Sequence, residues 1–181
     1  MLFEKTNIDG VFIITPNFIG DNRGYFVERY RKDLFDKEIG KVDFIQDNQS
    51  LSSKGVLRGL HYQKGEFSQA KLVWVLSGKV IDVAVDLRKD SPTFGKHVMV
   101  ELSGENRKML FIPRGFAHGF LVVSEEATFA YKVDNVYTPS EEVTIYFDDE
   151  DIDIKWPIEG MDIKLSEKDK KGIRFVDAEH F

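Results

Sequence analysis

The stretch KLVWVLSGKVIDVAVDLR, residues 71–88, decides the fold class. It contains two apolar runs, residues 71–77 and 79–86, on either side of the turn signal Ser-Gly-Lys at 77–79. In the second run, inward and outward positions alternate with the period of two that is typical of a strand. The stretch therefore predicts two strands separated by a tight turn.

Further short runs with strand composition lie on both sides of this stretch. Turn signals such as KDSPTFG at 89–95, SGEN at 103–106 and PRG at 113–115 separate them. Many short strands at such spacing predict an all-β sandwich or barrel. The other expected strands are residues 10–15, 24–29, 42–50, 97–102, 108–112, 117–122, 127–133 and 143–147.

Helical signals are few. The best candidate for a helix is residues 32–39, closed by Gly40 as a C-cap. The charged tail, residues 166–181, begins with Ser166 as a possible N-cap, and a short helix packed on the barrel is expected there. These peripheral helices do not change the all-β prediction.

The composition bounds the class of protein. The chain has 181 residues, of which 42% are hydrophobic and 31% charged, without repeats or linkers, so we expect one domain over residues 1–181. The net charge of −6 argues against a non-specific nucleic-acid binder, which would carry a basic excess. The absence of cysteine excludes disulfides, thiolate metal sites and cysteine nucleophiles.

No targeting or membrane signal is visible. The first residues, MLFEKTNIDGVFII, have no signal-peptide core, and no apolar run approaches the length of a membrane span. We therefore expect a cytoplasmic protein that does not insert into a membrane.

Two of the four histidines stand out. His61 lies in GVLRGLHYQ (55–63) and His118 in FIPRGFAHGF (111–120), each after glycines and a cation within strand-like sequence. His97 and His180 fit surface or incidental positions. Taken singly, a histidine on a strand is more often a buried structural residue than a catalyst, so both interpretations stay open for His61 and His118.

The pattern P-x-G-x-x-H, from Pro113 to His118, resembles the second motif of the cupin superfamily, in which the histidine is usually a metal ligand. The companion motif of that superfamily carries H-x-H, but here the second histidine is Gln63. A complete set of histidine and carboxylate ligands is therefore hard to assemble, and we expect chemistry without a metal.

Cations embedded in strand-like sequence suggest an anionic ligand. Arg23, Arg58, Lys71 and Lys168 lie in glycine-rich or aromatic-rich surroundings, and Lys71 opens the apolar run Lys-Leu-Val-Trp-Val. A charge within an apolar strand costs free energy unless it is paired or used, although a solvated strand edge would also explain Lys71. A pocket with several cations would suit a phosphorylated or nucleotide-linked ligand.

Together these motifs resemble the dTDP-4-dehydrorhamnose 3,5-epimerase family over nearly the whole chain. Their joint order and spacing carry the resemblance. The matching segments are DNRGYFVE (21–28), FIQDNQS (44–50), GVLRGLHYQ (55–63), KLV (71–73), DVAVDLR (82–88), SPTFG (91–95), FIPRGFAHGF (111–120), YK (131–132) and LSEKD (165–169).

The resemblance implies a double-stranded β-helix jelly roll of the cupin type, usually a homodimer. It implies isomerisation of dTDP-4-dehydro-6-deoxy-D-glucose to dTDP-4-dehydro-L-rhamnose, on the route to dTDP-L-rhamnose, without cofactor or metal. Both inverted carbons, C3 and C5, adjoin the C4 ketone, so the chemistry is removal and return of a proton through an enolate.

The resemblance also assigns the catalytic residues. His61 matches the base, and Asp169 the carboxylate that fixes its imidazole. Lys71 matches the cation that stabilises the enolate, and Tyr131 the acid that returns a proton from the opposite face. These four residue types are what proton abstraction next to a ketone requires.

The remaining family positions are expected to bind the nucleotide sugar. Tyr137 matches an aromatic that stacks on thymine. Many relatives carry another aromatic residue and a threonine where this chain has Val136 and Asp134. These two positions belong to the side of the site that is expected to bind the thymine base. The other implied substrate-binding residues are Arg23, Glu28, Gln46, Asp47, Asn48, Arg58, His118, Glu142 and Lys168.

Two alternatives remain open at the level of sequence. One is a relative that inverts only C3 or only C5, or a keto-isomerase that moves the ketone on a related nucleotide-linked sugar. The other is a cupin-like module that binds a metal or has lost catalysis.

Overall fold

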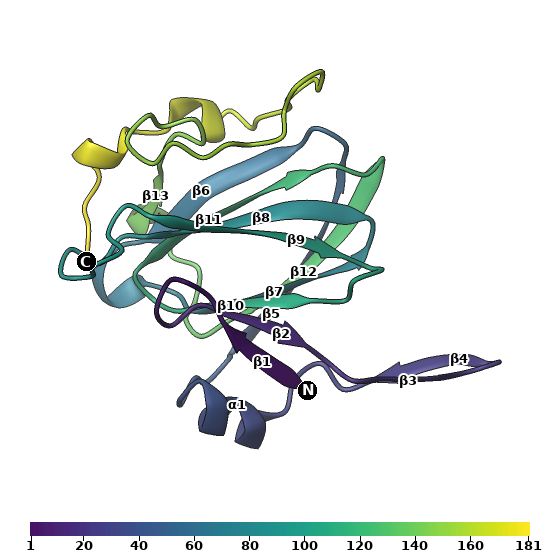
Figure 1. The fold of residues 1–181 in the computed structure, drawn as a ribbon. Helices are drawn as coiled ribbons and strands as arrows, with labels where there is room; N and C mark the ends of the chain where they lie inside the picture. Colours follow the sequence, from purple (N-terminus) through teal and green to yellow (C-terminus); the bar gives the residue numbers. More distant parts are fainter.

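Two antiparallel sheets pack face to face in the computed structural model, which describes residues 1–181 (Figure 1). The six-stranded sheet has the order β1-β2-β10-β7-β12-β5, and the five-stranded sheet has the order β13-β6-β11-β8-β9. The strands are β1 (Leu2–Lys5), β2 (Phe12–Thr15), β3 (Phe18–Asp21), β4 (Gly24–Val27), β5 (Gln46–Ser53), β6 (Leu57–Gln63), β7 (Lys71–Ser77), β8 (Lys79–Asp86), β9 (His97–Ser103), β10 (Met109–Ile112), β11 (Phe116–Val122), β12 (Glu126–Val133) and β13 (Glu142–Thr144). The all-β prediction is confirmed.

The stretch that decided the fold class crosses from one sheet to the other. Strand β7 belongs to the six-stranded sheet, whereas β8 belongs to the five-stranded sheet. The chain turns between them at Gly78, whose φ is +78° and whose absent Cβ would lie 2.0 Å from the carbonyl oxygen of Glu126. A side chain at this corner would collide with the backbone, so only glycine fits.

The main core lies between the two sheets. Val73 and Val75 of β7 face Val80 and Ala84 of β8 within one buried cluster. Because side chains alternate along a strand, Asp82 points to the same interior as Val80 and Ala84. A fully buried carboxylate thus enters the sandwich.

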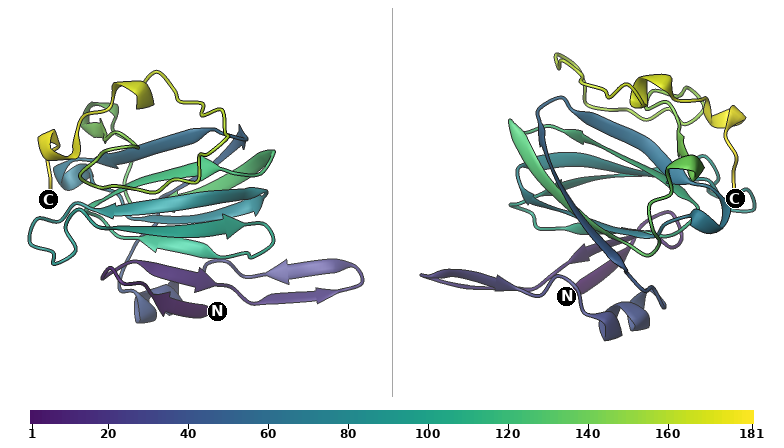
Figure 2. Two further views of the ribbon diagram at one scale, coloured as in Figure 1. Left: turned by 45° about the horizontal axis from the view of Figure 1, so that its top comes forward. Right: turned by 180° about the vertical axis from the view of Figure 1, so that it is seen from behind.

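Separate layers cover the outer face of each sheet (Figures 1 and 2). Helix α1 (Lys32–Glu38) packs Phe35 against the six-stranded sheet, and the segment after β13 packs Trp156 and Phe175 against the five-stranded one. The helix prediction is confirmed, including Gly40, which has a φ of +114° and donates its N–H to the carbonyl of Phe35.

The short helix expected in the tail is present as two 3-10 helices, η3 (Asp169–Lys171) and η4 (Phe175–Asp177), and Phe175 packs against the five-stranded sheet. Ser166 does accept a hydrogen bond from the Asp169 N–H, at 3.1 Å. Helix η3 ends before Gly172, whose backbone lies so close to Tyr146 that an added Cβ would be 3.0 Å from the Tyr146 nitrogen.

Three strands were missing from the expected set: β1, β3 and β6. Strand β6 was not predicted because a glycine interrupts its apolar pattern. Gly59 lies so close to Gly119 of β11 that an added Cβ would be 2.6 Å from the Gly119 Cα. Several boundaries also differ: β5 covers Gln46–Ser53 rather than residues 42–50, and β13 covers Glu142–Thr144 rather than residues 143–147.

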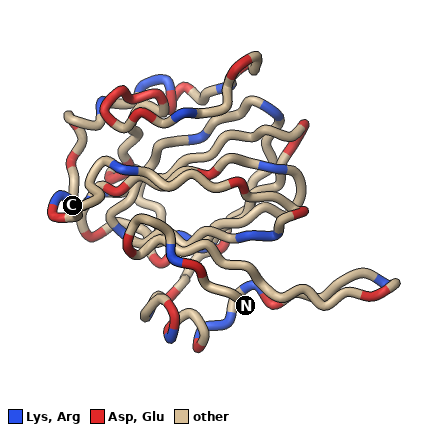
Figure 3. The backbone as a smooth tube through the Cα atoms, viewed as in Figure 1, with Lys and Arg blue, Asp and Glu red and all other residues tan.

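The hairpin β3–β4 projects away from the sandwich in all views (Figures 1 and 2). Its aromatic and aliphatic side chains are exposed: Ile19 by 70%, Tyr25 by 59% and Phe26 by 67%. Acidic and basic residues both occur near its tip, and elsewhere the two signs are interspersed along the chain (Figure 3). Such an apolar projection is unusual for a surface that stays in water.

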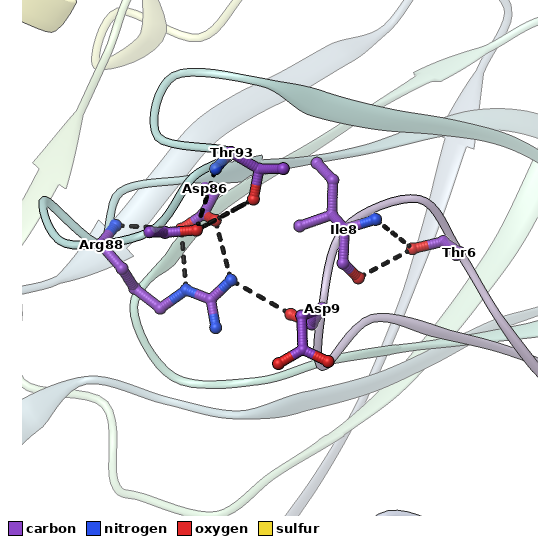
Figure 4. Close-up of polar contacts among 7 residues, drawn as sticks. Thr6, Ile8, Asp9, Asp86, Arg88 and Thr93 are labelled. Carbon is purple, nitrogen blue, oxygen red and sulfur yellow. Dashed lines mark hydrogen bonds and ion pairs between the residues drawn. The ribbon is translucent and has the colours of Figure 1, made fainter.

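A buried carboxylate organises the turn between β8 and β9. Asp86 accepts hydrogen bonds from the Arg88 guanidinium and the hydroxyls of Ser91 and Thr93, at 2.6–2.8 Å. Arg88 also donates to the carbonyl of Asp9, so the network ties this turn to the N-terminal segment (Figure 4). None of the helices is long and apolar enough to cross a membrane.

Candidate active site

A pocket of about 420 Å³ opens between the two sheets and gathers most of the predicted site residues. Strands of both sheets contribute to its wall. Its lining comprises Gln46, Asn48, Gln49, Ser50, Arg58, His61, Gln69, Lys71, His118, Phe120, Phe129, Tyr131, Val133, Tyr137, Glu142 and Lys168.

His61 of β6 is paired with a buried carboxylate. Its Nε2 lies 2.6 Å from Oδ1 of Asp169, which is only 3% exposed. Burial alone would raise the pKa of Asp169, but hydrogen bonds from His61 and Ser166 outweigh it and lower that pKa to about 2. Asp169 is therefore ionised near neutral pH, and its carboxylate holds the imidazole ring of His61 by a short hydrogen bond.

Lys71 opens β7 with no carboxylate within ion-pair distance. Burial lowers the pKa of its ammonium group to about 8, against the opposing influence of Glu142 and Asp82. The group is still mostly protonated at neutral pH. A desolvated cation without a close partner can stabilise negative charge that develops on a ligand.

Tyr131 of β12 enters the pocket from the sheet opposite His61. In register it lies across from Asn48 of β5 on one side and Val73 of β7 on the other. Burial raises the pKa of its phenol above the ordinary value of 10, so the hydroxyl keeps its proton. The candidate acid and the candidate base thus stand on opposite walls.

His118 forms a second histidine–carboxylate pair. It faces His61 directly across the β6–β11 ladder, and its Nε2 lies 3.0 Å from both carboxylate oxygens of Asp82. Burial lowers the pKa of His118. Sequence reasoning missed Asp82, although the alternation of VIDVAVD places it on the inward side together with Val80.

Three polar residues form the rim of the pocket. Glu142 accepts hydrogen bonds from the Tyr137 hydroxyl, at 2.8 Å, and from Lys168 Nζ, at 2.9 Å. Burial would raise the pKa of Glu142, but these two donors lower it overall. The rim therefore fixes an aromatic ring and a cation beside each other.

The six-stranded sheet and β6 add further polar groups. Gln46 donates to the Asn48 side chain at 2.9 Å, and Arg58 donates to the hydroxyl of Ser52. Gln46, Asn48 and Arg58 all line the pocket, as the sequence predicted.

Three predicted substrate-binding residues lie outside this pocket. Asp47 occupies the opposite face of β5 from Gln46 and Asn48, where it pairs with Lys132 at 2.7 Å. Arg23 and Glu28 belong to the projecting hairpin and the segment that follows it, away from the pocket of their own chain. Asp47 lies outside the pocket because side chains alternate between the two faces of β5. Arg23 and Glu28 lie outside it because they belong to the projecting hairpin and the segment that follows it.

Two stacked rings that sequence reasoning did not single out also line the pocket. Phe120 of β11 and Phe129 of β12 lie 4.1 Å apart between ring centroids, at an interplanar angle of 14°. The two rings come from different sheets, so the stack bridges the sandwich beside the candidate catalytic residues. The alternation of apolar residues along β11 and β12 predicts that both rings are buried, but it does not predict that they line a pocket.

The side-chain donors do not gather as a metal centre. No group of three or more histidine, aspartate or glutamate side chains is arranged to hold a metal ion. Gln63, at the position of the second histidine of a cupin motif, forms hydrogen bonds to backbone groups instead.

Comparison with known proteins identifies this arrangement. The family model described as dTDP-4-dehydrorhamnose 3,5-epimerase matches residues 5–177. A curated relative of that name from Shigella flexneri is 52% identical over 178 residues, which cover 98% of this chain and 97% of the relative.

Solved structures agree over the same length. The dTDP-4-dehydrorhamnose 3,5-epimerase of Elizabethkingia anophelis NUHP1 superposes with a TM-score of 0.94 at 50% identity, covering 98% of this chain and 97% of that one. The dTDP-6-deoxy-D-glucose-3,5-epimerase of Legionella pneumophila Philadelphia 1, in complex with dTDP-4-keto-L-rhamnose, gives 0.93 at 46% identity, covering 97% and 93%. The expected jelly roll is confirmed, and the chain belongs to the dTDP-4-dehydrorhamnose 3,5-epimerase family.

Proposed function

We propose that this chain converts dTDP-4-dehydro-6-deoxy-D-glucose to dTDP-4-dehydro-L-rhamnose by inverting C3 and C5 of the sugar. One observation carries the proposal at the level of residues. His61 of one sheet, which is paired with Asp169, and Tyr131 of the other sheet line a single pocket, together with the cation Lys71. Inversion needs a base and an acid on opposite faces of a ring, and this sandwich supplies one from each wall.

His61 is the base in this proposal. Because the ionised Asp169 accepts the Nε2–H, the lone pair of the neutral imidazole is on Nδ1. Nδ1 removes the proton from the carbon next to the ketone, and the electrons of the C–H bond move to the ketone oxygen. The resulting imidazolium is stabilised by the carboxylate at 2.6 Å.

Lys71 and Tyr131 complete the proton transfer. The ammonium group of Lys71 stabilises the enolate oxygen, a contribution that is typically worth about 3–4 kcal/mol for one well-placed donor. Tyr131 then donates its hydroxyl proton to the other face of the same carbon, which inverts the centre. The proton held by His61 and the tyrosinate exchange with solvent before the next cycle.

The rest of the pocket suits a nucleotide diphosphate. Arg58 and Lys168 supply positive charge for phosphate oxygens, and His118, Gln46 and Asn48 supply polar contacts. Tyr137, half exposed at the rim, supplies a face on which a thymine ring can stack.

We also propose that residues 1–181 form one epimerase domain that works as a homodimer. The exposed apolar hairpin carries Arg23, a predicted substrate-binding residue that its own pocket does not use. Insertion of the hairpin against a second copy would bury Ile19, Tyr25 and Phe26 and bring Arg23 and Glu28 to the partner's pocket. This arrangement accounts for both predicted residues without moving the strands.

Solvent exchange tests the reaction. When enzyme and dTDP-4-dehydro-6-deoxy-D-glucose are incubated in deuterated water, NMR of the product should show deuterium at both C3 and C5. Label at one carbon only would indicate a mono-epimerase, and label at neither would refute the proposed chemistry. Boiled enzyme and the His61→Ala variant control for spontaneous enolisation.

A further inference from the structure

Gln63 is a buried polar residue at the edge of the pocket that the proposed reaction does not use. It ends β6, is only 3% exposed, and stands two residues after His61. A primary amide at this depth must find hydrogen-bond partners, because an unpaired buried amide is costly. Its partners therefore indicate what it does.

All of its side-chain bonds go to backbone groups, and two of them flank Tyr137. The Gln63 Oε1 accepts a hydrogen bond from the Thr138 N–H at 2.6 Å, while Nε2 donates to the carbonyl of Val136 at 3.1 Å. Nε2 also donates to the carbonyl of Phe67 at 2.7 Å. One side chain thus holds the residues immediately before and after Tyr137.

Packing alone does not hold this part of the chain. Val136 is 54% exposed and Tyr137 52% exposed, so neither side chain is anchored in the core. The backbone of Gln63 is paired with Glu142, the residue that accepts the Tyr137 hydroxyl. Gln63 is therefore connected to Tyr137 both through the backbone of residues 136–138 and through the partner of the phenol.

The start of the same segment is fixed by two neighbouring residues. Asp134 accepts a hydrogen bond from the Ala70 N–H at 2.7 Å, and Gln69 donates to the carbonyl of Asn135 at 2.8 Å. These bonds secure residues 134–135, and Glu142 accepts the hydroxyl of Tyr137. The side-chain bonds of Gln63 hold the backbone on both sides of Tyr137.

We infer that Gln63 is a positioning residue for nucleotide binding, which holds residues 136–138 so that the Tyr137 ring is presented to the base. The inference rests on the proposed stacking role of Tyr137. Gln63 replaces the second histidine of the cupin metal motif, so a position that elsewhere serves a metal here serves the loop that contacts the ligand. Its loss should weaken binding of the nucleotide more than it slows the chemical step.

A double-mutant cycle with dTDP as the probe tests this inference. Calorimetric titration should show that Gln63→Met, which is neutral and of similar length, weakens dTDP binding by about tenfold, the effect of leaving one buried polar group unpaired. In the Tyr137→Ala background the same change should alter the dissociation constant by less than about twofold, because a residue that acts through Tyr137 is coupled to it and has no effect on binding once the ring is gone. KM for the sugar nucleotide should rise in Gln63→Met while kcat stays close to that of the wild type.

Other outcomes overturn the inference. Equal losses in both backgrounds would show that Gln63 does not act through Tyr137, and unchanged binding in Gln63→Met would show that it positions nothing. If Tyr137→Ala binds dTDP as tightly as the wild type, both the stacking role of Tyr137 and the inference for Gln63 are refuted. The deuterium experiment tests the proposed reaction independently of this result. Glu66→Gln, an exposed change on the turn below the same segment, is the control.

If Gln63→Met does not fold, Gln63→Glu provides the same test. The introduced carboxylate can still accept the Thr138 N–H but cannot donate to Val136. Any direct repulsion between its charge and the diphosphate persists in the Tyr137→Ala background, so the cycle removes it. If Gln63→Glu weakens dTDP binding more in the wild type than in Tyr137→Ala, the inference is supported. Equal losses of affinity in the two backgrounds contradict it.

Discussion

At the scale of single residues, the contact of His61 Nε2 with Asp169 leaves Nδ1 as the nitrogen that takes a proton in the proposed reaction. Replacement of His61 by alanine removes the proposed base, and Tyr131→Phe removes the proposed acid while keeping the ring. Each should lower kcat by roughly the 10²–10⁴-fold typical of a lost acid or base. Steady-state kinetics on the keto sugar, with thermal unfolding to verify folding, measures the effect.

Tyr146→Phe is the matched control for this pair, because Tyr146 lies outside the pocket. It should retain the activity of the wild type. Full inversion of both carbons at an undiminished rate by Tyr131→Phe would show that another group donates the proton.

The low pKa of Lys71 predicts an alkaline limit to activity. As the pH rises through about 8, the ammonium group becomes neutral and can no longer stabilise the enolate, so kcat/KM should fall. Tyr131 cannot cause this limb, because burial raises its pKa above 10. In Lys71→Arg the guanidinium stays charged to well above pH 8, so any remaining activity should persist to higher pH.

A pH–rate profile of both proteins checks this prediction. An alkaline limb at the same pH in wild type and Lys71→Arg would show that a different group titrates.

The sequence predicted the residues of the pocket better than their partners. His61, Lys71 and Tyr131 were identified by resemblance, and the structure brings them together. Asp82 and Gln63 were missed as functional partners, since nothing local shows that a carboxylate in an alternating strand will meet a histidine on the next strand. Asp47 lies on the opposite face from the pocket, which the alternation along β5 determines. The individual roles of the pocket residues stay predictions.

At the scale of elements, Asp86 holds the turn between β8 and β9 and the guanidinium of Arg88, which in turn donates to the carbonyl of Asp9 in the N-terminal segment (Figure 4). Burial would raise its pKa, but the bonds from Arg88, Ser91 and Thr93 lower it to about 2. A depressed carboxylate pKa stabilises the fold above the unfolded value of about 4, and this contribution is lost as the pH falls toward 2. Asp86→Asn should therefore cost about 2 kcal/mol of unfolding free energy at neutral pH.

Urea unfolding at several pH values measures this cost. The difference between wild type and Asp86→Asn should shrink as the pH is lowered from about 4 to about 2, because the wild type then loses its charge as well. The exposed neighbour Asp90→Asn is the control, and an equal loss there would rule out a specific role for the network.

Strand composition predicted most elements but not how they connect. The turn at Gly78 was recognised, yet a two-sheet corner and a hairpin look alike in sequence, because both need a glycine between two apolar runs. Strand β6 was hidden because Gly59 replaces a side chain where two backbones touch. The tail forms two short 3-10 helices on either side of Gly172, whose backbone lies against Tyr146.

At the scale of the whole molecule, the projecting hairpin predicts that two chains share their sites. Arg23→Ala and His61→Ala should each be poorly active alone, but mixed and allowed to exchange subunits they should regain roughly a quarter of wild-type activity. Half of the dimers are then mixed, and one of the two pockets in each mixed dimer carries neither defect. Light scattering should show a dimer for all three proteins.

Two results would contradict this prediction. A monomer with full activity would exclude the shared site, and a dimer whose mixtures regain nothing would show that Arg23 serves its own chain. A cytoplasmic location and independence from metal also remain predictions.

The stack of Phe120 on Phe129 has an evolutionary consequence. These rings join the two walls that carry the proposed base and the proposed acid, and their 4.1 Å contact helps to set how far apart the walls stand. Exchange of either ring for a smaller or larger one changes the gap that a sugar ring must span, while His61 and Tyr131 stay the same residues. The width of the pocket can therefore drift through substitutions in the hydrophobic interior, at positions that take no part in the proposed proton transfer.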